Sequence, residues 1–304
     1  MAITLHRFTF DAMAGTHELQ LGATSVAVAR GAAAAAIADV ARIEAKYSRY
    51  RDDSLTTRIN RAAGADAVPI DAETVSLLRY ADECFALSDG RFDLTSGVLR
   101  RVWNFRAAVP RLPAPAALDD ARALIGWQDV EWDDRAIRLP RAGMEIDFGG
   151  IGKEYAADRV ATICREHGIA SGLVNLGGDV RAIGAQPDGA PWRVGIRHPR
   201  DPGRAIAVLD VVDAAVATSG DYERFVEIDG ARYCHLLDPR TGMPVAHWQS
   251  VSVVAPLAVV AGSLATIAML FEAPALAFLA AQRAPYVAVD AAGALHRSPL
   301  AAAA

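Results

Sequence analysis

The chain has 304 residues, 52% of them hydrophobic, which is enough apolar material for a large buried core. Its formal net charge of −5 leaves no basic excess, so a nucleic acid is not expected as a partner. The three cysteines are far apart and odd in number, and they form neither a CxxC pair nor a zinc spacing. The cysteines therefore indicate neither a disulfide framework nor a structural zinc.

The first half of the chain favours helices. In chain order the predicted elements are a strand over 19–29, helices over 32–47, 71–88 and 118–124, strands over 130–139 and 144–148, and a helix over 153–167. Asp89-Gly90 and Gly168 are typical of helix ends. The proline-rich run from Pro110 to Pro115 predicts a surface excursion over about 106–118.

The second half favours strands. Short strands are expected over 173–176, 180–183, 192–196, 205–212, 225–228, 251–255 and 286–289, with helices beginning at 256 and over 275–281. Residues 251–271 carry no charge, but Pro256 and Gly262 interrupt them, which favours a buried strand and helix over a membrane span. Strands and helices cluster instead of alternating, so we expect an α+β fold in one unit over 1–304, ordered from about 3 to 298.

The N-terminal residues show no signal-peptide pattern. As written, the chain is expected in the cytoplasm, or in the periplasm if the true start lies upstream.

Two glycine-rich segments are candidates for a ligand site. From Asp147 to Tyr155 a strand is expected to lead through three glycines into a helix, whose first amides suit an anion. A plain strand-to-helix turn explains this segment equally well. The run from Asn175 to Asp179 is more simply explained as a hairpin turn, although its glycines could line a flat ligand.

Polar residues gather in two further segments. Between Tyr233 and Gly242, His235 precedes an Asp238-Pro239 turn, where it could act as a general base facing a cleft. Alternation along a strand places Cys234 on the opposite face, which argues against a Cys–His pair. In the segment 90–105, Asp93 and Thr95 could cap a helix near residue 96, or the aromatic residues there could flank a planar ring.

Together and in this order, these segments resemble the ApbE family of FAD:protein FMN transferases. The resemblance covers about residues 13 to 290. The matching segments are 14–16, 47–60, 90–95, 147–158, 175–179, 218–222 and 233–244.

The resemblance implies a T-fold-related α+β fold that binds FAD and Mg²⁺. It also implies transfer of FMN from FAD to a threonine or serine hydroxyl of a target flavoprotein, with release of AMP. His235 would be the catalytic base, and the Gly150 carbonyl and Thr266 would be metal ligands. The residues implied as FAD contacts are Ala14, Tyr50, Arg91, Phe92, Asp93, Asp147, Lys153 and Leu236.

The chain departs from the family pattern at three positions. Ala14 stands where the family has methionine, Glu154 where it has glycine, and Gly262 where it has the aspartate of an Ala-Asp-x-x-x-Thr metal motif. Either Ser263, Glu154 or another carboxylate supplies the missing charge, or metal affinity is reduced. If the motif has simply decayed, Gly262→Asp should raise the affinity for magnesium. Two other functions therefore stay open: hydrolysis of FAD to FMN and AMP, and non-catalytic FAD binding or flavoprotein maturation.

Overall fold

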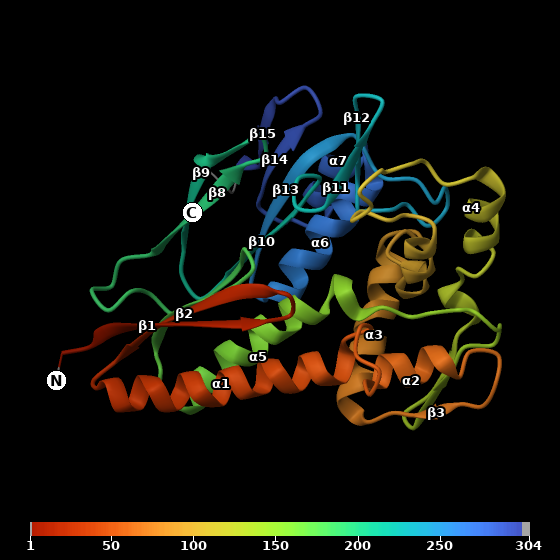
Figure 1. Ribbon diagram of the computed structural model, residues 1–304. Helices are drawn as coiled ribbons and strands as arrows, with labels where there is room; N and C mark the ends of the chain where they lie inside the picture. Colours follow the sequence, from red (N-terminus) through yellow and green to blue (C-terminus); the bar gives the residue numbers. More distant parts are fainter. Residues whose placement is uncertain (1, 300–304) are drawn as a thin grey trace.

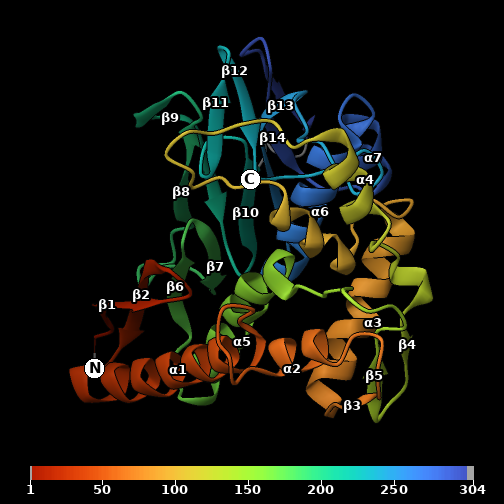
Figure 2. The ribbon, with the colours of Figure 1, turned by 45° about the vertical axis from the view of Figure 1, so that its right-hand side comes forward.

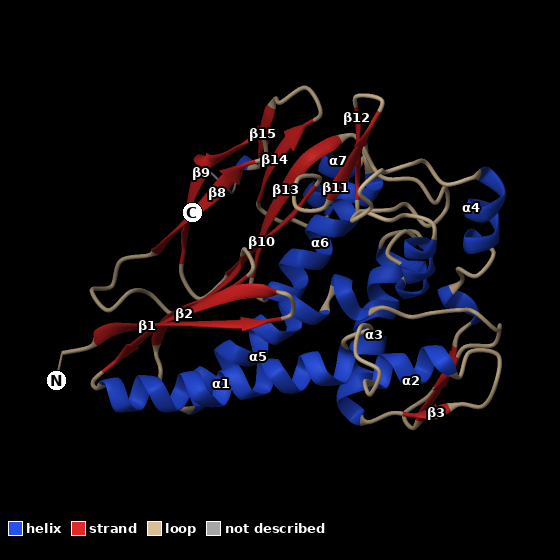
Figure 3. Ribbon diagram, in the orientation of Figure 1, coloured by secondary structure: helices blue, strands red, loops and turns tan. Residues whose placement is uncertain are grey.

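The computed structural model describes residues 2–299 and is built on one eight-stranded sheet (Figures 1 and 3). In spatial order its strands are β1 (Thr4–Ala12), β2 (Gly15–Ala23), β6 (Ser171–Leu176), β7 (Asp179–Ile183), β10 (Ala215–Gly220), β13 (Trp248–Ala255), β14 (Tyr286–Asp290) and β15 (Leu295–Arg297). Every neighbouring pair is antiparallel. Both ends of the chain therefore contribute to one sheet.

Three helices cover one face of this sheet. They are α1 (Val26–Tyr47), which runs along β1 and β2 in Figure 1, α5 (Gly152–Glu166) and α6 (Ala258–Phe271). Side chains alternate across β10, so Ala215 and Ala217 belong to the core under these helices while Val216 belongs to the opposite face. The short α7 (Ala275–Ala281) packs against α6.

The hairpin of β8 (Trp192–His198) and β9 (Asp201–Val211) contributes to the core on the opposite face. Every second residue of β8 is buried, and Trp192, Val194 and Ile196 form a cluster with Val216 of β10. This half-buried alternation is what a strand over one apolar face requires. The central strands β7 and β10 are therefore covered on both sides.

The remaining elements extend the helical side of the molecule. They are α2 (Leu55–Arg61), β3 (Val68–Pro69), α3 (Ala72–Leu87), the 3₁₀ helix η1 (Leu94–Arg101), α4 (Pro115–Arg122), η2 (Trp127–Asp129), β4 (Glu131–Trp132), β5 (Ala136–Arg138), η3 (Phe148–Gly150) and the hairpin β11 (Phe225–Ile228) and β12 (Ala231–Cys234). The irregular segment 102–114 passes close to the β11–β12 hairpin (Figure 2).

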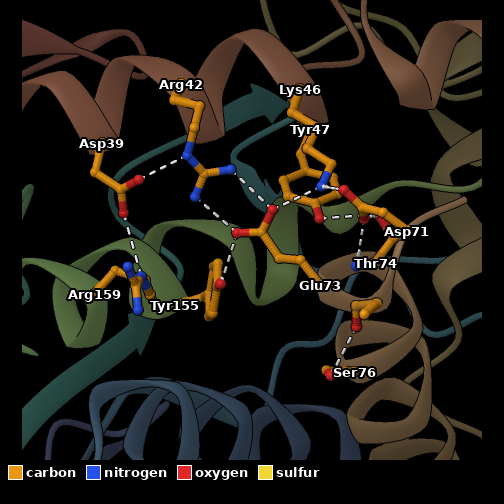
Figure 4. Close-up of polar contacts among 11 residues, drawn as sticks. Asp39, Arg42, Lys46, Tyr47, Asp71, Glu73, Thr74, Ser76, Tyr155 and Arg159 are labelled. Carbon is orange, nitrogen blue, oxygen red and sulfur yellow. Dashed lines mark hydrogen bonds and ion pairs between the residues drawn. The ribbon is translucent and has the colours of Figure 1, made fainter.

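An ion-pair network joins α1, α3 and α5 (Figure 4). Glu73 accepts two hydrogen bonds of 2.8 Å from Arg42, one of 2.6 Å from Lys46 and one of 2.7 Å from the hydroxyl of Tyr155. Burial alone would raise the pKa of Glu73, but these donors lower it to about 2. The network fixes α5 to α1 and α3.

The α+β class and most predicted elements are confirmed, including a buried β13 and α6 over the uncharged run 251–271. No helix within residues 2–299 is both long and apolar enough to cross a membrane. The surface excursion predicted over 106–118 is irregular up to residue 114, after which α4 begins.

Three expectations about single elements were wrong. The strand expected over 19–29 ends at Ala23, because Ser25 caps α1 by accepting a 3.3 Å hydrogen bond from the backbone of Val28. The strand expected over 144–148 does not form, because both backbone groups of Ile146 pair with the side chain of Asn60, at 2.7 and 3.0 Å. The last long helix starts at Ala258 and not at Pro256.

Other differences concern elements that are divided or that were not expected. Residues 130–139 form two short strands, β4 and β5, where one was expected. The strands β1, β3 and β15 and the helix α2 were not predicted.

Candidate functional site

The turn before α5 brings backbone groups and an aromatic ring together. Asp147 accepts a 3.0 Å hydrogen bond from the backbone of Gly149 and starts η3, which ends at Gly150. A Cβ at Gly150 would stand 3.1 Å from Cζ of Phe92. A side chain there would have to displace this ring, so the segment holds its backbone close to Phe92.

Lys153 of α5 is paired with Asp179 at the start of β7. Their charged atoms lie 2.6 Å apart, and Asp179 is 3% exposed. Burial alone would lower the pKa of Lys153, but the pKa is raised, because Asp179 and Glu154 stabilise the ammonium. The Asn175–Asp179 segment is the predicted hairpin turn, and it delivers Asp179 to this ion pair.

Glu154, the next residue of α5, reaches across to α6. Its carboxyl lies where a side chain at Gly262 would begin, since a Cβ at Gly262 would stand 2.6 Å from Cγ and 2.9 Å from Oε1 of Glu154. The residue is 8% exposed, and its Oε2 has no hydrogen-bond partner among the described residues. Burial and the charge of Asp179 raise the pKa of Glu154 to about 8.

The position of α6 depends on a second residue of α5. Asp158 accepts hydrogen bonds of 2.8 and 2.9 Å from the backbones of Ala258 and Val259, and it thereby caps the first turn of α6. Further along α6, the hydroxyl of Thr266 is 2.8 Å from that of Ser219 on β10. Thr266 therefore faces the central strands.

His235 follows β12 and is oriented by the backbone. Its Nδ1 donates a 3.2 Å hydrogen bond to the carbonyl of Arg224, which leaves Nε2 as the acceptor in the neutral ring. Burial lowers the pKa of His235, and the nearby positive charges of Arg224 and Lys153 lower it further. As predicted, Cys234 is not its partner, because that thiol is buried and donates to the Val245 carbonyl at 3.4 Å.

Leu236 and the aromatic residues complete the surroundings of His235. The half-buried Leu236 accepts a 3.0 Å backbone hydrogen bond from Val245. Trp103 stacks between Phe105 and Tyr233 with ring centroids 5.8 and 5.7 Å away. Its indole also donates a 2.8 Å hydrogen bond to the Gly242 carbonyl. Trp103 thus connects the segment after η1 to both ends of the segment 233–242.

Ala14 lies in the tight turn between β1 and β2. Met13 and Ala14 both have left-handed backbones, with φ of 48° and 61°. For residues other than glycine this conformation costs roughly 1–2 kcal/mol each. Beside the turn, His17 is buried and donates a 2.8 Å hydrogen bond from Nε2 to the carbonyl of Ala12. Burial lowers the pKa of His17, and the charge of Lys153 contributes to this shift.

Tyr50 and Asp147 lie on either side of Arg100. Tyr50 is 73% exposed, and its hydroxyl accepts a 3.5 Å hydrogen bond from Arg100, which also pairs with Asp147. Arg49 approaches Asp147 at 3.7 Å and lies over the ring of Tyr50. Two arginines therefore adjoin predicted FAD contacts. The sequence interpretation missed both. Arg49 directly precedes Tyr50, which is a usable signal, whereas Arg100 is distant in the sequence from both Tyr50 and Asp147.

Arg91 and Asp93 have partners within the chain. The guanidinium of Arg91 lies over the ring of Phe271 and donates a 3.0 Å hydrogen bond to Asp89. Asp93 is buried and accepts hydrogen bonds from the backbone and hydroxyl of Thr95, both 2.6 Å, and from the Trp127 backbone at 3.2 Å. The structure thus supports the capping interpretation of Asp93, with the cap at a 3₁₀ helix.

The structure places some of the predicted residues in two groups. Lys153 is close enough to His235 and His17 for its charge to affect the pKa of both. Tyr50 and Asp147 form the second group, which is joined to the first by the turn before α5. Within residues 2–299 there is no cluster of three or more His, Cys, Asp or Glu side chains of the kind that holds a metal by itself. A cation here would need carbonyl and hydroxyl ligands as well.

Comparisons with known proteins agree on one family. Residues 13–289 match the model of the ApbE family. The FAD:protein FMN transferase of Salmonella typhimurium is 35% identical over 219 residues, which are 69% of this chain and 63% of that protein. The protein of the same name from Treponema pallidum is 36% identical over 241 residues, 73% of this chain and 66% of that protein. The matched part thus spans just under two thirds of these two relatives.

Solved structures match over nearly the whole chain. The crystal structure of the ApbE protein of Thermotoga maritima superimposes with a TM-score of 0.89, at 31% identity and 98% coverage of both chains. The apo form of the Pseudomonas stutzeri flavinyl transferase ApbE has a TM-score of 0.88 at 28% identity, covering 98% of this chain and 96% of that one.

Proposed function

This chain belongs to the ApbE family, and we propose that it is an FAD:protein FMN transferase that acts on a target flavoprotein. The observation that carries this proposal is the state of His235. Its Nδ1 is engaged by the Arg224 carbonyl, and burial lowers its pKa, so the ring is neutral near pH 7 with Nε2 free to accept a proton. A base in this state suits the activation of a hydroxyl group.

In the proposed reaction His235 takes the proton from a threonine or serine hydroxyl of the target. The hydroxyl oxygen forms a bond to the phosphorus atom on the FMN side of the FAD diphosphate. The bond from that phosphorus to the bridging oxygen breaks, and AMP leaves with this oxygen. The products are a phosphoester-linked FMN and AMP, and the proton held by His235 balances the step.

The negative charge of the diphosphate calls for cations around it. Lys153 at the first turn of α5 is a fixed cation, and its ammonium lies beside Gly177, in the turn between β6 and β7. Arg49 and Arg100 are two further cations next to Tyr50 and Asp147. We propose that these side chains hold FAD through its phosphates. The remaining proposed FAD contacts are Ala14, Tyr50, Arg91, Phe92, Asp93, Asp147 and Leu236.

Magnesium fits this part of the molecule. The hard oxygen ligands that Mg²⁺ prefers are present as the Gly150 carbonyl and the Thr266 hydroxyl, and Glu154 adds a buried carboxylate oxygen that lacks a hydrogen-bond partner among the described residues. When bound, Mg²⁺ would neutralise charge on the diphosphate. We therefore propose Gly150 and Thr266 as ligands.

One experiment separates transfer from the two other functions. The purified protein is incubated with FAD, Mg²⁺ and a peptide that carries an acceptor threonine, and flavin fluorescence of the peptide and free AMP are measured. A fluorescent peptide with equimolar AMP supports transfer. FMN and AMP without a labelled peptide would indicate hydrolysis, and FAD that is bound but unchanged would indicate a flavin-binding protein.

A further inference from the structure

Glu154 is a buried acid with one carboxyl oxygen that no described residue satisfies. It is 8% exposed, it interacts with the carboxyl of Asp179 and the charge of Lys153, and no described residue donates a hydrogen bond to its Oε2. A buried polar atom without a hydrogen bond is costly, so Oε2 is expected to have a partner that the described part of the chain does not supply.

The charges around Glu154 are unbalanced. Asp179 is buried beside it, with one oxygen 2.6 Å from the ammonium of Lys153. Two carboxylates therefore share one lysine in a buried space. A second positive charge would complete this group, and within residues 2–299 the partners of these three side chains include no second cation.

The carboxyl of Glu154 is also held in a particular place. It fills the space beside Gly262, where even a methyl group would meet its Cγ at 2.6 Å. Gly262 and Thr266 are four residues apart on α6 and therefore lie on the same face of the helix, one turn from each other. Glu154 thus presents its carboxyl to the face of α6 that carries the Thr266 hydroxyl.

We propose that Glu154 is the carboxylate ligand of a divalent-cation site between α5 and α6, and that it supplies from α5 the charge that Gly262 does not supply from α6. The assignment deepens the proposed function, but cation binding can be measured without FMN transfer. A carboxylate, a hydroxyl and a backbone carbonyl are hard oxygen ligands, so the expected ion is Mg²⁺, which Mn²⁺ can replace as a probe.

This assignment changes the expectation for Gly262→Asp. In the native chain an aspartate at 262 would collide with Glu154 and would add a third carboxylate to the buried group. The single substitution is therefore expected to destabilise the fold and not to raise metal affinity. Only the exchange of both residues, Glu154→Gly with Gly262→Asp, removes the collision and keeps one carboxylate between the helices.

The test is Mn²⁺ binding to the full-length protein, measured by the loss of the free-ion electron paramagnetic resonance signal with and without FAD. Removing the charged ligand in Glu154→Gln should weaken binding by about tenfold or more, since affinity follows the charge of the ligands. Glu166→Gln is the matched control, because it makes the same change at an exposed position of α5. The double exchange should bind more tightly than Glu154→Gln.

The outcomes separate the two proposals. Unchanged Mn²⁺ binding in Glu154→Gln, or no binding to the native chain with or without FAD, would overturn the site. Circular dichroism melting curves distinguish lost binding from lost folding in each variant. If Mn²⁺ binds through Glu154 but no peptide becomes labelled, the cation site stands and the transferase assignment fails.

Discussion

Replacing Gly262 by alanine measures how tightly Glu154 occupies the space between α5 and α6. In a helix interior, glycine to alanine usually stabilises a protein by about 1 kcal/mol. Here the new Cβ would stand 2.6 Å from Cγ and 3.0 Å from Cδ of Glu154, a side chain that is itself buried. Overpacking of this kind costs about 1–3 kcal/mol. After the gain of about 1 kcal/mol is subtracted from this cost, Gly262→Ala is expected to lower the free energy of unfolding by roughly 0–2 kcal/mol.

The control is Gly31→Ala in α1, because a Cβ at Gly31 meets no atom within 4 Å. This variant should gain the full propensity term of about 1 kcal/mol. The same gain should appear for Gly262→Ala in a Glu154→Ala background, where the obstructing side chain is absent. The coupling between positions 154 and 262 in this double-mutant cycle is expected to equal the overpacking cost, about 1–3 kcal/mol.

Urea denaturation followed by circular dichroism gives all four free energies on one scale. The reasoning is refuted if Gly262→Ala stabilises the native chain as much as Gly31→Ala does. It also fails if the cycle shows no coupling, since the carboxyl of Glu154 would then move aside freely.

Three other predictions follow from named contacts. His235→Ala should retain FAD but lose transfer, with His167→Ala as an exposed control; unimpaired transfer would remove His235 as the base. Because the pKa of Glu73 is lowered in the folded chain to about 2, its contribution is present above the unfolded value near 4.3 and is lost as the pH falls towards 2. Glu73→Gln should therefore lower the free energy of unfolding by only about 1–2 kcal/mol at pH 7, because the partners of Glu73 are partly exposed. Below pH 2 it should change little, and urea titrations at both pH values would show the difference. Asp158→Ala should cost about 1–2 kcal/mol through the lost cap of α6, and an unchanged urea midpoint would contradict this.

The sequence predicted those parts of the fold that depend on local patterns. The helices α1, α3 and α5 have strong periodicity or clear end signals, and β13 and α6 follow from an uncharged run with a proline between them. The expected strand over 144–148 failed because its backbone is satisfied by the side chain of Asn60, which lies 86 positions before Ile146. Such a long-range pairing leaves no local signal.

In the candidate site, too, features with a local sequence signal could be predicted and features that depend on long-range packing could not. The proposed base, His235, and the turn before α5 could be inferred from residue types and order. That Glu154 fills the space at Gly262 could not, because the two residues are 108 positions apart and meet only through the packing of α5 on α6. In the sequence they are two separate departures from a pattern, and in the structure they are complementary.

The cap that Asp158 provides also determines how α6 can respond to a ligand. Glu154 and Asp158 are one helical turn apart on α5, and their neighbours Gly262 and Ala258 are one turn apart on α6 in the opposite direction. The helices are thus antiparallel and in a fixed register. Shifting the sequence register of α6 against α5 by one residue would turn the contacting face of α6 by about 100°. The shift would also break both hydrogen bonds to Asp158. A cation between these helices would therefore meet a preformed backbone and a carboxyl group that is already held in place, so its binding would need to order little of the chain.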